Sequence, residues 1–345
     1  MSQTLDRWIY GNDYVKERTI KKFFFLEWDN SYLPKNCKWI QEKPDNINYN
    51  KEIVWNINGI KEKINIIGYL DFSKKKNNKK NFKSDIVNEK ILKSNLQKCI
   101  RRGYTEKALK TANQYMEINI TNFLRRLSVI MLEDVVLHES FNVIMWLICA
   151  SSDYKINSII KSYLLGIVYF LSECKYVERI NKFDYNFYND IDKINKLDNN
   201  KELSIIYSLC LRTSYGGMNN DIKRFQSFIK IWLEYFQNKN SKKNYLYEKI
   251  RPIKINNEMA TDDIHISCID FHIFPVIKNI LKDYPDYSEK QIKDCIWYNR
   301  SFITNKKSIN NLKRVDNHYV EIYEKIDKKL KALSYFYIYK YFDKE

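Results

Sequence analysis

Residues 122–137 read NFLRRLSVIMLEDVVL, and this stretch decides the fold class. Its apolar side chains, such as Phe123 and Leu127, return at steps of three and four residues, which is the period of a helix with one buried face. Asn119 and Thr121 precede the stretch and supply a break and an N-cap. The pattern therefore predicts a helix that packs against other helices.

The same period occurs on both sides of this stretch. Upstream, apolar residues between Ile91 and Ile100 recur at helical steps until Gly103, which predicts a helix end. Ser288 and Gln291 form a capping-box pattern, which predicts a helix start. Further helical patterns cover residues 141–150, 156–175, 267–282, 288–300 and about 315–342. We therefore expect a mainly α protein with a helical, bundle-like body.

The N-terminal residues 1–72 lack a clean helical period. The runs 51–59 and 63–70 are rich in β-branched residues, and the Asn58–Gly59 pair between them is typical of a tight turn. These features predict a hairpin, and hence a small mixed α/β region at the N-terminus.

Composition suggests where the chain divides. Residues 73–83 read SKKKNNKKNFK, a polar, basic and low-complexity sequence that is typical of a linker. We expect a helical domain over residues 84–236 and a C-terminal helical region over residues 246–345 that packs on it.

The chain is strongly basic. Lys and Arg number 59 against 42 Asp and Glu, which gives a formal net charge of +17. Such a charge attracts polyanions, nucleic acid among them. The abundance of Lys and Asn with few Gly and Pro is also typical of A+T-rich genomes, including those of large DNA viruses, so part of the charge reflects composition.

The cysteines and the apolar runs indicate an intracellular protein. Seven scattered cysteines without a CxxC pair argue for a reducing compartment and against a disulfide framework. Residues 1–6 carry no apolar signal core, and the apolar run 143–150 is too short to span a bilayer. We expect a cytoplasmic, nuclear or viral-factory location, without membrane insertion.

Three short motifs suggest a distant relationship. Residues 95–103 read NLQKCIRRG, residues 108–112 read ALKTA, and residues 123–135 read FLRRLSVIMLEDV. Over residues 95–137 the chain thereby resembles the C-terminal helical module of the RarA/MgsA group of clamp-loader-like AAA+ ATPases. The resemblance implies tetramer assembly and a role at stalled replication forks. The chain has no GxxxxGK[ST] loop, so the resemblance does not extend to ATP hydrolysis.

The arginines of this region have two interpretations. They suit contact with nucleic-acid phosphates, and they also suit an internal ion-pair network with nearby acids, which we favour. The predicted network joins Arg101, Arg102, Arg125 or Arg126 to Glu133 and Asp134.

Two adjacent glycines, Gly216 and Gly217, stand out in a chain with only seven. They predict either a helix C-cap with a turn, which we favour, or a backbone anion site flanked by Arg212, Lys223 and Arg224.

Residues 262–272 gather potential metal ligands. Asp263, His265, Asp270 and His272 are of the types that bind zinc or another divalent metal, as a hydrolase or nuclease requires. The alternative is a polar turn whose histidines form internal hydrogen bonds.

Aromatic and basic residues interleave over residues 296–307. Such a pattern is typical of surfaces that bind phosphates and stack bases, and it includes Arg300, Lys306 and Lys307. For Trp297 we favour a place in the core, and for Arg300 a place at a helix end.

Together these observations suggest three functions. The first is a non-enzymatic nucleic-acid-associated accessory protein in DNA replication or repair, with no resident cofactor. The second is a structural protein that forms homo-oligomers through the helical module. The third is a metal-dependent hydrolase that uses residues 262–272.

Overall fold

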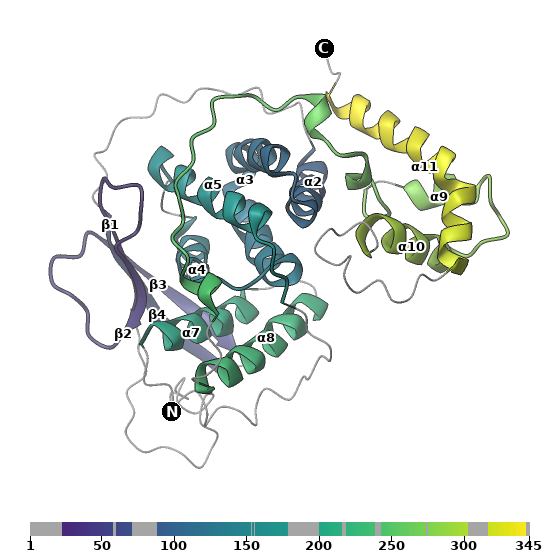
Figure 1. Ribbon diagram of the computed structural model, residues 1–345. Coiled ribbons are helices and arrows are strands. Elements are labelled where there is room, and N and C mark those ends of the chain that lie inside the picture. Colours follow the sequence, from purple (N-terminus) through teal and green to yellow (C-terminus); the bar gives the residue numbers. More distant parts are fainter. Residues whose placement is uncertain are drawn as a thin grey trace. The chain divides into compact units, whose positions relative to one another are not determined.

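The computed structural model describes residues 23–57, 60–70, 88–152, 154, 156–178, 200–215, 219–238, 243–273, 275–302 and 317–342. They form two compact units, and neither unit is one uninterrupted stretch of chain (Figure 1). The first unit draws on residues 1–75, 127–163 and 178–252, and the second on residues 76–126, 164–177 and 253–345. The expected linker at residues 73–83 lies outside the described residues.

A four-stranded mixed sheet forms part of the first unit. Its strands are β1 (Phe23–Trp28), β2 (Asn36–Ile40), β3 (Tyr49–Ile57) and β4 (Ile60–Leu70). They lie in the order β2-β1-β4-β3, with β1 and β4 parallel and the outer pairs antiparallel. The predicted pairing of β3 with β4 is confirmed, while the turn residues 58–59 lie outside the description.

Helices cover this sheet through buried tryptophans. In α4 (Phe141–Ala150) every residue is buried, and the indole of Trp146 donates to the carbonyls of Phe24 and Ile67, each at 3.1 Å. From the sheet, the indole of Trp39 donates to Ser208 of α7 (Asn200–Ser214) at 3.3 Å. Helix α8 (Asn219–Gln237) packs beside α7 (Figure 1). A short 3₁₀ helix, η2 (Asn244–Tyr247), follows.

The second unit is helical. Two helices contribute to both units, α3 (Thr105–Asp134) and α5 (Ser158–Glu173). The second unit further contains α2 (Glu89–Arg102), 3₁₀ helices η3 (Thr261–Asp263) and η4 (Ile266–Cys268), α9 (Val276–Leu281), α10 (Glu289–Trp297), the π-turn η5 (Tyr298–Phe302) and α11 (Asn317–Phe342). The fold is thus mainly helical with an N-terminal sheet, as the sequence predicted.

Local caps end and break these helices where the sequence indicates. Gly103 follows α2 with a φ of 70°, and its N–H donates to the carbonyl of Ile100. Asn119 interrupts α3 with non-helical angles, and its side chain accepts from the N–H of Asn122 at 3.0 Å. Ser288 and Gln291 form the predicted capping box at the start of α10.

The helix expected over residues 267–282 is much shorter. Only α9 is α-helical there, and η4 with a turn precedes it. His265 and Asp270 accept hydrogen bonds from the backbone N–H groups of Ser267 and His272, and Pro275 precedes α9 without an N–H of its own. Side chains that bond local backbone compete with helix formation. Among the described residues, no helix combines the length and the apolar character that a bilayer span requires.

Candidate nucleic-acid interface

Helix α2 exposes a polar stripe opposite its apolar, buried side. Lys90 and Lys93 are exposed, and Gln97 and Arg101 are half-buried. Their spacing of three and four residues puts them on one side of the helix. The stripe exists because Leu92, Leu96 and their apolar neighbours take the other side.

Two further segments add polar groups beside this stripe. Arg126 of α3 donates to the side-chain oxygen of Gln97 at 3.1 Å, and Arg125 next to it is exposed. Desolvation lowers the pKa of His272; Asp270 raises it, and the charges of Lys98, Arg126 and Lys93 lower it. His272 is therefore within electrostatic reach of the stripe. We call Lys93, Gln97, Arg101, Arg126 and His272 the basic face.

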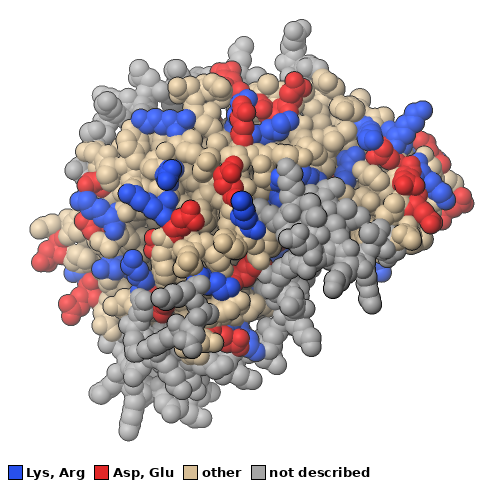
Figure 2. Space-filling view, viewed as in Figure 1, with Lys and Arg blue, Asp and Glu red and all other residues tan. Residues whose placement is uncertain are grey.

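Charge is unevenly distributed along the chain around this face. Residues 88–126 contain nine Lys or Arg against three Asp or Glu, whereas residues 127–163 contain two against four. On the side of the molecule in Figure 2, the two signs are interspersed. Residues 223–254 contain nine Lys or Arg against two Asp or Glu, so residues 88–126 are one of several basic stretches in a basic chain.

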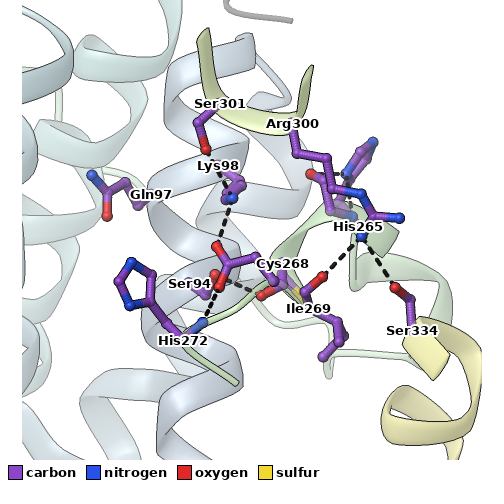
Figure 3. A network of polar contacts seen from close by, with 12 residues as sticks. Ser94, Gln97, Lys98, His265, Cys268, Ile269, His272, Arg300, Ser301 and Ser334 are labelled. Carbon is purple, nitrogen blue, oxygen red and sulfur yellow. Dashed lines mark hydrogen bonds and ion pairs between the residues drawn. The ribbon is translucent and has the colours of Figure 1, made fainter. Parts of the chain in front are cut away.

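A buried ion pair lies on the inner side of α2 (Figure 3). The ammonium of Lys98 is 2.9 Å from a carboxylate oxygen of Asp270, and each side chain is only 6% exposed. Lys98 also donates to the hydroxyl of Ser301 at 3.1 Å, and Ser94 donates to the carbonyl of Cys268 at 2.7 Å. Burial lowers the pKa of Lys98, and Asp270 opposes that shift. These contacts attach η4, the following turn and the π-turn to α2.

Arg300 completes the same network. Its side chain is buried and donates to the carbonyls of Ile266 and Ile269, at 3.2 and 2.8 Å, and to the hydroxyl of Ser334 at 3.1 Å. Its own carbonyl accepts a hydrogen bond from Arg102. These hydrogen bonds join the π-turn to η4 and to α11 (Figure 3).

The pKa of His265 reports the positive charge of this region. The pKa of His265 is lowered to about 4. Burial is the largest cause, and the positive charges of Arg102, Lys107, Arg300 and Lys98 lower it further, in that order. Four cations therefore lie within reach of one imidazole. The carboxylate of Asp270 balances the charge of Lys98. The other three cations and those of the basic face make the region positive.

The arginines and lysines that the sequence suggested for nucleic acid fall into three groups. Arg101, Arg125, Arg126 and Lys223 reach the surface. Arg102, Arg212, Arg224 and Arg300 make internal contacts. Lys306 and Lys307 lie outside the described residues, and so does the predicted glycine turn at Gly216 and Gly217.

The contacts of the second group lie within the protein. Arg212 is buried, donates to Ser128 at 3.0 Å and lies 4.7 Å from the ring centre of Phe225. Arg224 pairs with Glu133, which is a partner that the predicted arginine network did not include. We therefore leave these arginines out of the interface.

The predicted metal ligands do not converge. The carboxylate of Asp263 accepts from the N–H of Ala260 at 2.8 Å and pairs with Lys110 at 3.2 Å. The Nδ1 atom of His265 lies 2.7 Å from the hydroxyl of Ser267, and Asp270 pairs with Lys98. No group of three or more His, Cys, Asp or Glu suited to a metal occurs within the described part of the chain. The alternative interpretation, a polar turn with internal hydrogen bonds, fits this geometry.

Sequence reasoning missed Lys93 and Gln97 and misplaced Trp297. The steps from Lys93 to Gln97 to Arg101 are each four residues, so a search for one helix side would have found them. Trp297, expected in the core, is 50% exposed.

The comparisons with known proteins add no relative. No family model matches the chain, and the searches of curated proteins and of solved structures found no match either. The function is therefore argued from this chain's own residues.

Proposed function

We propose that this protein is a non-enzymatic nucleic-acid-binding protein that contacts phosphates through the basic face. The observation that supports this most is the placement of Lys93 and Arg101 on one side of α2, with Arg126 hydrogen-bonded to Gln97 between them. The resemblance of residues 95–137 to the RarA/MgsA helical module favours a role in replication or repair.

The chemistry of the face suits phosphates. Lys and Arg provide charge-assisted donors, and Gln97 and His272 can add neutral ones. Arg126 is oriented by its hydrogen bond to Gln97. Arg126 and the Gln97 amide are therefore positioned before a ligand arrives, which lowers the entropy cost of binding.

A network of buried hydrogen bonds lies beneath the face. Lys98, Arg102 and Arg300 join α2 to the segments that follow His265 and Trp297, all through buried contacts. A surface mounted on such a network keeps its spacing, and a fixed spacing is what repeated phosphate contacts require.

A salt series tests the proposal. The full chain is titrated into labelled single- and double-stranded DNA, and anisotropy is followed between about 50 and 200 mM salt, where 6–10 phosphate contacts would lose roughly 10³–10⁵ in affinity. In the triple variant Lys93→Gln, Arg101→Gln, Arg126→Gln, we expect the logarithmic salt slope to become shallower by about two to three.

A matched variant serves as the control. Lys38→Gln, Lys43→Gln, Lys249→Gln removes the same charge from exposed sites of the first unit. The salt slope of this control should stay close to that of the unmodified chain. Absence of binding at low salt, or an equal change in both triple variants, would rule out the basic face. A concentration-dependent oligomer that ignores nucleic acid would instead favour the assembly function.

A further inference from the structure

An exposed aromatic pair lies at the end of α10. Trp297 is 50% exposed and Phe302 is 39% exposed. Their rings stack with centres 5.4 Å apart and planes within 24°. Exposing two adjacent apolar rings to water is unfavourable, and contiguous exposed apolar patches can mark binding sites.

The pair is held in a fixed orientation. Phe302 also stacks on Tyr298, with ring centres 5.5 Å apart. Tyr298 is buried and in turn contacts Tyr319 of α11 at 5.4 Å. The aromatic pair is therefore the outer end of a stack that continues into the core of the second unit.

The π-turn that carries Phe302 is attached to α2, which carries the basic face. Lys98 donates to Ser301, the residue before Phe302. Arg102, the residue after Arg101, donates to the carbonyl of Arg300. These two contacts hold the π-turn against the C-terminal half of α2, where Arg101 also lies.

Cations also precede the pair along α10. Lys290 and Lys293 stand seven and four residues before Trp297, so they share its side of the helix. Lys290 is exposed, and Lys293 pairs with Glu289 at 2.6 Å. Glu289 and Asp294 balance these two lysines, so the net positive charge beside the aromatic pair comes from α2.

From this arrangement we infer that the protein binds single-stranded nucleic acid, with an unpaired base stacked on Trp297 and Phe302 and the adjoining phosphates on the basic face. This inference rests on the proposed function and names its substrate class. Aromatic platforms beside basic grooves are how single strands are bound without sequence preference. In a duplex the base faces are already stacked on one another, so they are not available to the pair.

Charge complementarity favours this occupant over an apolar protein surface. A protein partner for Trp297 and Phe302 alone would not need the cations of α2. A nucleic acid uses both kinds of group at once, since every nucleotide has one phosphate and one flat base.

The test compares strands and variants in one assay. Binding of the full chain to single-stranded DNA and to a duplex of equal length is measured for the unmodified protein, Trp297→Ala, Trp297→Phe and the control Phe336→Ala. Phe336 is 56% exposed on α11, so it matches Trp297 in exposure. All three substitutions are at the surface, and thermal unfolding followed by circular dichroism checks that each variant folds.

We expect Trp297→Ala to weaken single-strand binding about 5- to 150-fold, the range that base stacking provides, with an unchanged salt slope because no charge is removed. Trp297→Phe should restore most of the affinity, and Phe336→Ala should match the unmodified protein. Duplex binding should be indifferent to Trp297.

Other outcomes would overturn the inference in distinguishable ways. Equal affinity for single strand and duplex, with no effect of Trp297→Ala, would refute base stacking and leave the proposed function standing. Loss of binding in Phe336→Ala as large as in Trp297→Ala would also refute it. If neither nucleic acid binds at low salt, both the inference and the proposed function fail.

Discussion

The two units stabilise their interiors in different ways. In the first unit the interior is aromatic and apolar: Phe24 stacks on Trp39 with ring centres 4.7 Å apart, and Trp146 fills the space between the sheet and α4. In the second unit the interior contains the Lys98–Asp270 pair and the buried Arg300. Both units bury apolar surface, and the second unit also contains an ion pair in which each side chain is only 6% exposed.

This difference bears on function. Apolar packing is strong but not directional, whereas hydrogen-bonded charges fix the relative position of the groups that they join. In the second unit they join α2 to the segments around His272 and Phe302, which form the proposed binding surface. We infer that the polar interior is retained because it positions that surface, a use of buried ion pairs that is known in some proteins.

Breaking the buried ion pair should have the largest effect. Asp270→Asn keeps the shape of the side chain but leaves the Lys98 ammonium buried without its counter-charge. We expect a loss of about 3–5 kcal/mol in the free energy of unfolding, measured by urea denaturation of the full chain.

The second substitution Lys98→Met tests the cause. In Asp270→Asn combined with Lys98→Met no buried charge remains, and we expect most of the lost stability to return, since apolar replacements of buried pairs are often neutral. If the double variant is as unstable as Asp270→Asn, the pair matters for its hydrogen bonds rather than its charge.

The sequence allowed prediction of features that depend on neighbouring residues. The end of α2 at Gly103, the break at Asn119 and the capping box at Ser288 all follow from side chains within a few positions of the event. The mainly helical fold with its N-terminal strands followed from periodicity in the same way.

Features that depend on distant residues could not be predicted. Arg300 looked like a helix-end cation, but the carbonyls of Ile266 and Ile269 and the hydroxyl of Ser334 enclose it. Trp297 looked like a core residue, because composition does not reveal that Tyr298 next to it takes the inward position. The interleaving of the two units along the chain is equally invisible to local patterns.

A buried carboxylate in the first unit gives the next largest effect. Burial raises the pKa of Glu178 to about 7, opposed first by the charge of Lys243, whose ammonium lies 3.5 Å away. Because the folded-state pKa lies above the unfolded value of 4.5, this group favours folding at acid pH, and that contribution is lost as pH rises from about 4.5 to about 7.

Glu178→Gln should remove this pH dependence. At pH 8 we expect the variant to be more stable than the unmodified protein by up to about 3 kcal/mol, since one pKa unit corresponds to about 1.4 kcal/mol. The difference between their unfolding free energies should vanish below pH 4.5. Taking the difference also removes the opposite contribution of His138, whose pKa burial lowers to about 4. A constant difference at all pH values would mean that Glu178 titrates normally.

The smallest of these effects concerns a close backbone approach in the sheet. A Cβ added to Gly68 would lie 2.6 Å from the carbonyl oxygen of Leu26 and 3.4 Å from the ring of Trp146. Gly68→Ala should therefore cost about 1–3 kcal/mol through overpacking, measured as a lower midpoint of urea unfolding of the full chain. Gly103→Ala gives the contrast in the second unit: its nearest neighbour, the carbonyl of Ser172, is 3.4 Å away, but its φ of 70° costs an L-residue roughly 1–2 kcal/mol.

A side chain at residue 68 is thus disfavoured by lack of space, and one at residue 103 by the backbone angle. Gly103→Asn should therefore be less destabilising than Gly103→Ala, because Asn tolerates the left-handed region. Gly68→Asn should be more destabilising than Gly68→Ala, because its side chain is larger. If Asn is tolerated equally at both sites, the sheet yields to the added side chain, and the aromatic interior is less tightly packed than the contacts of Trp146 imply.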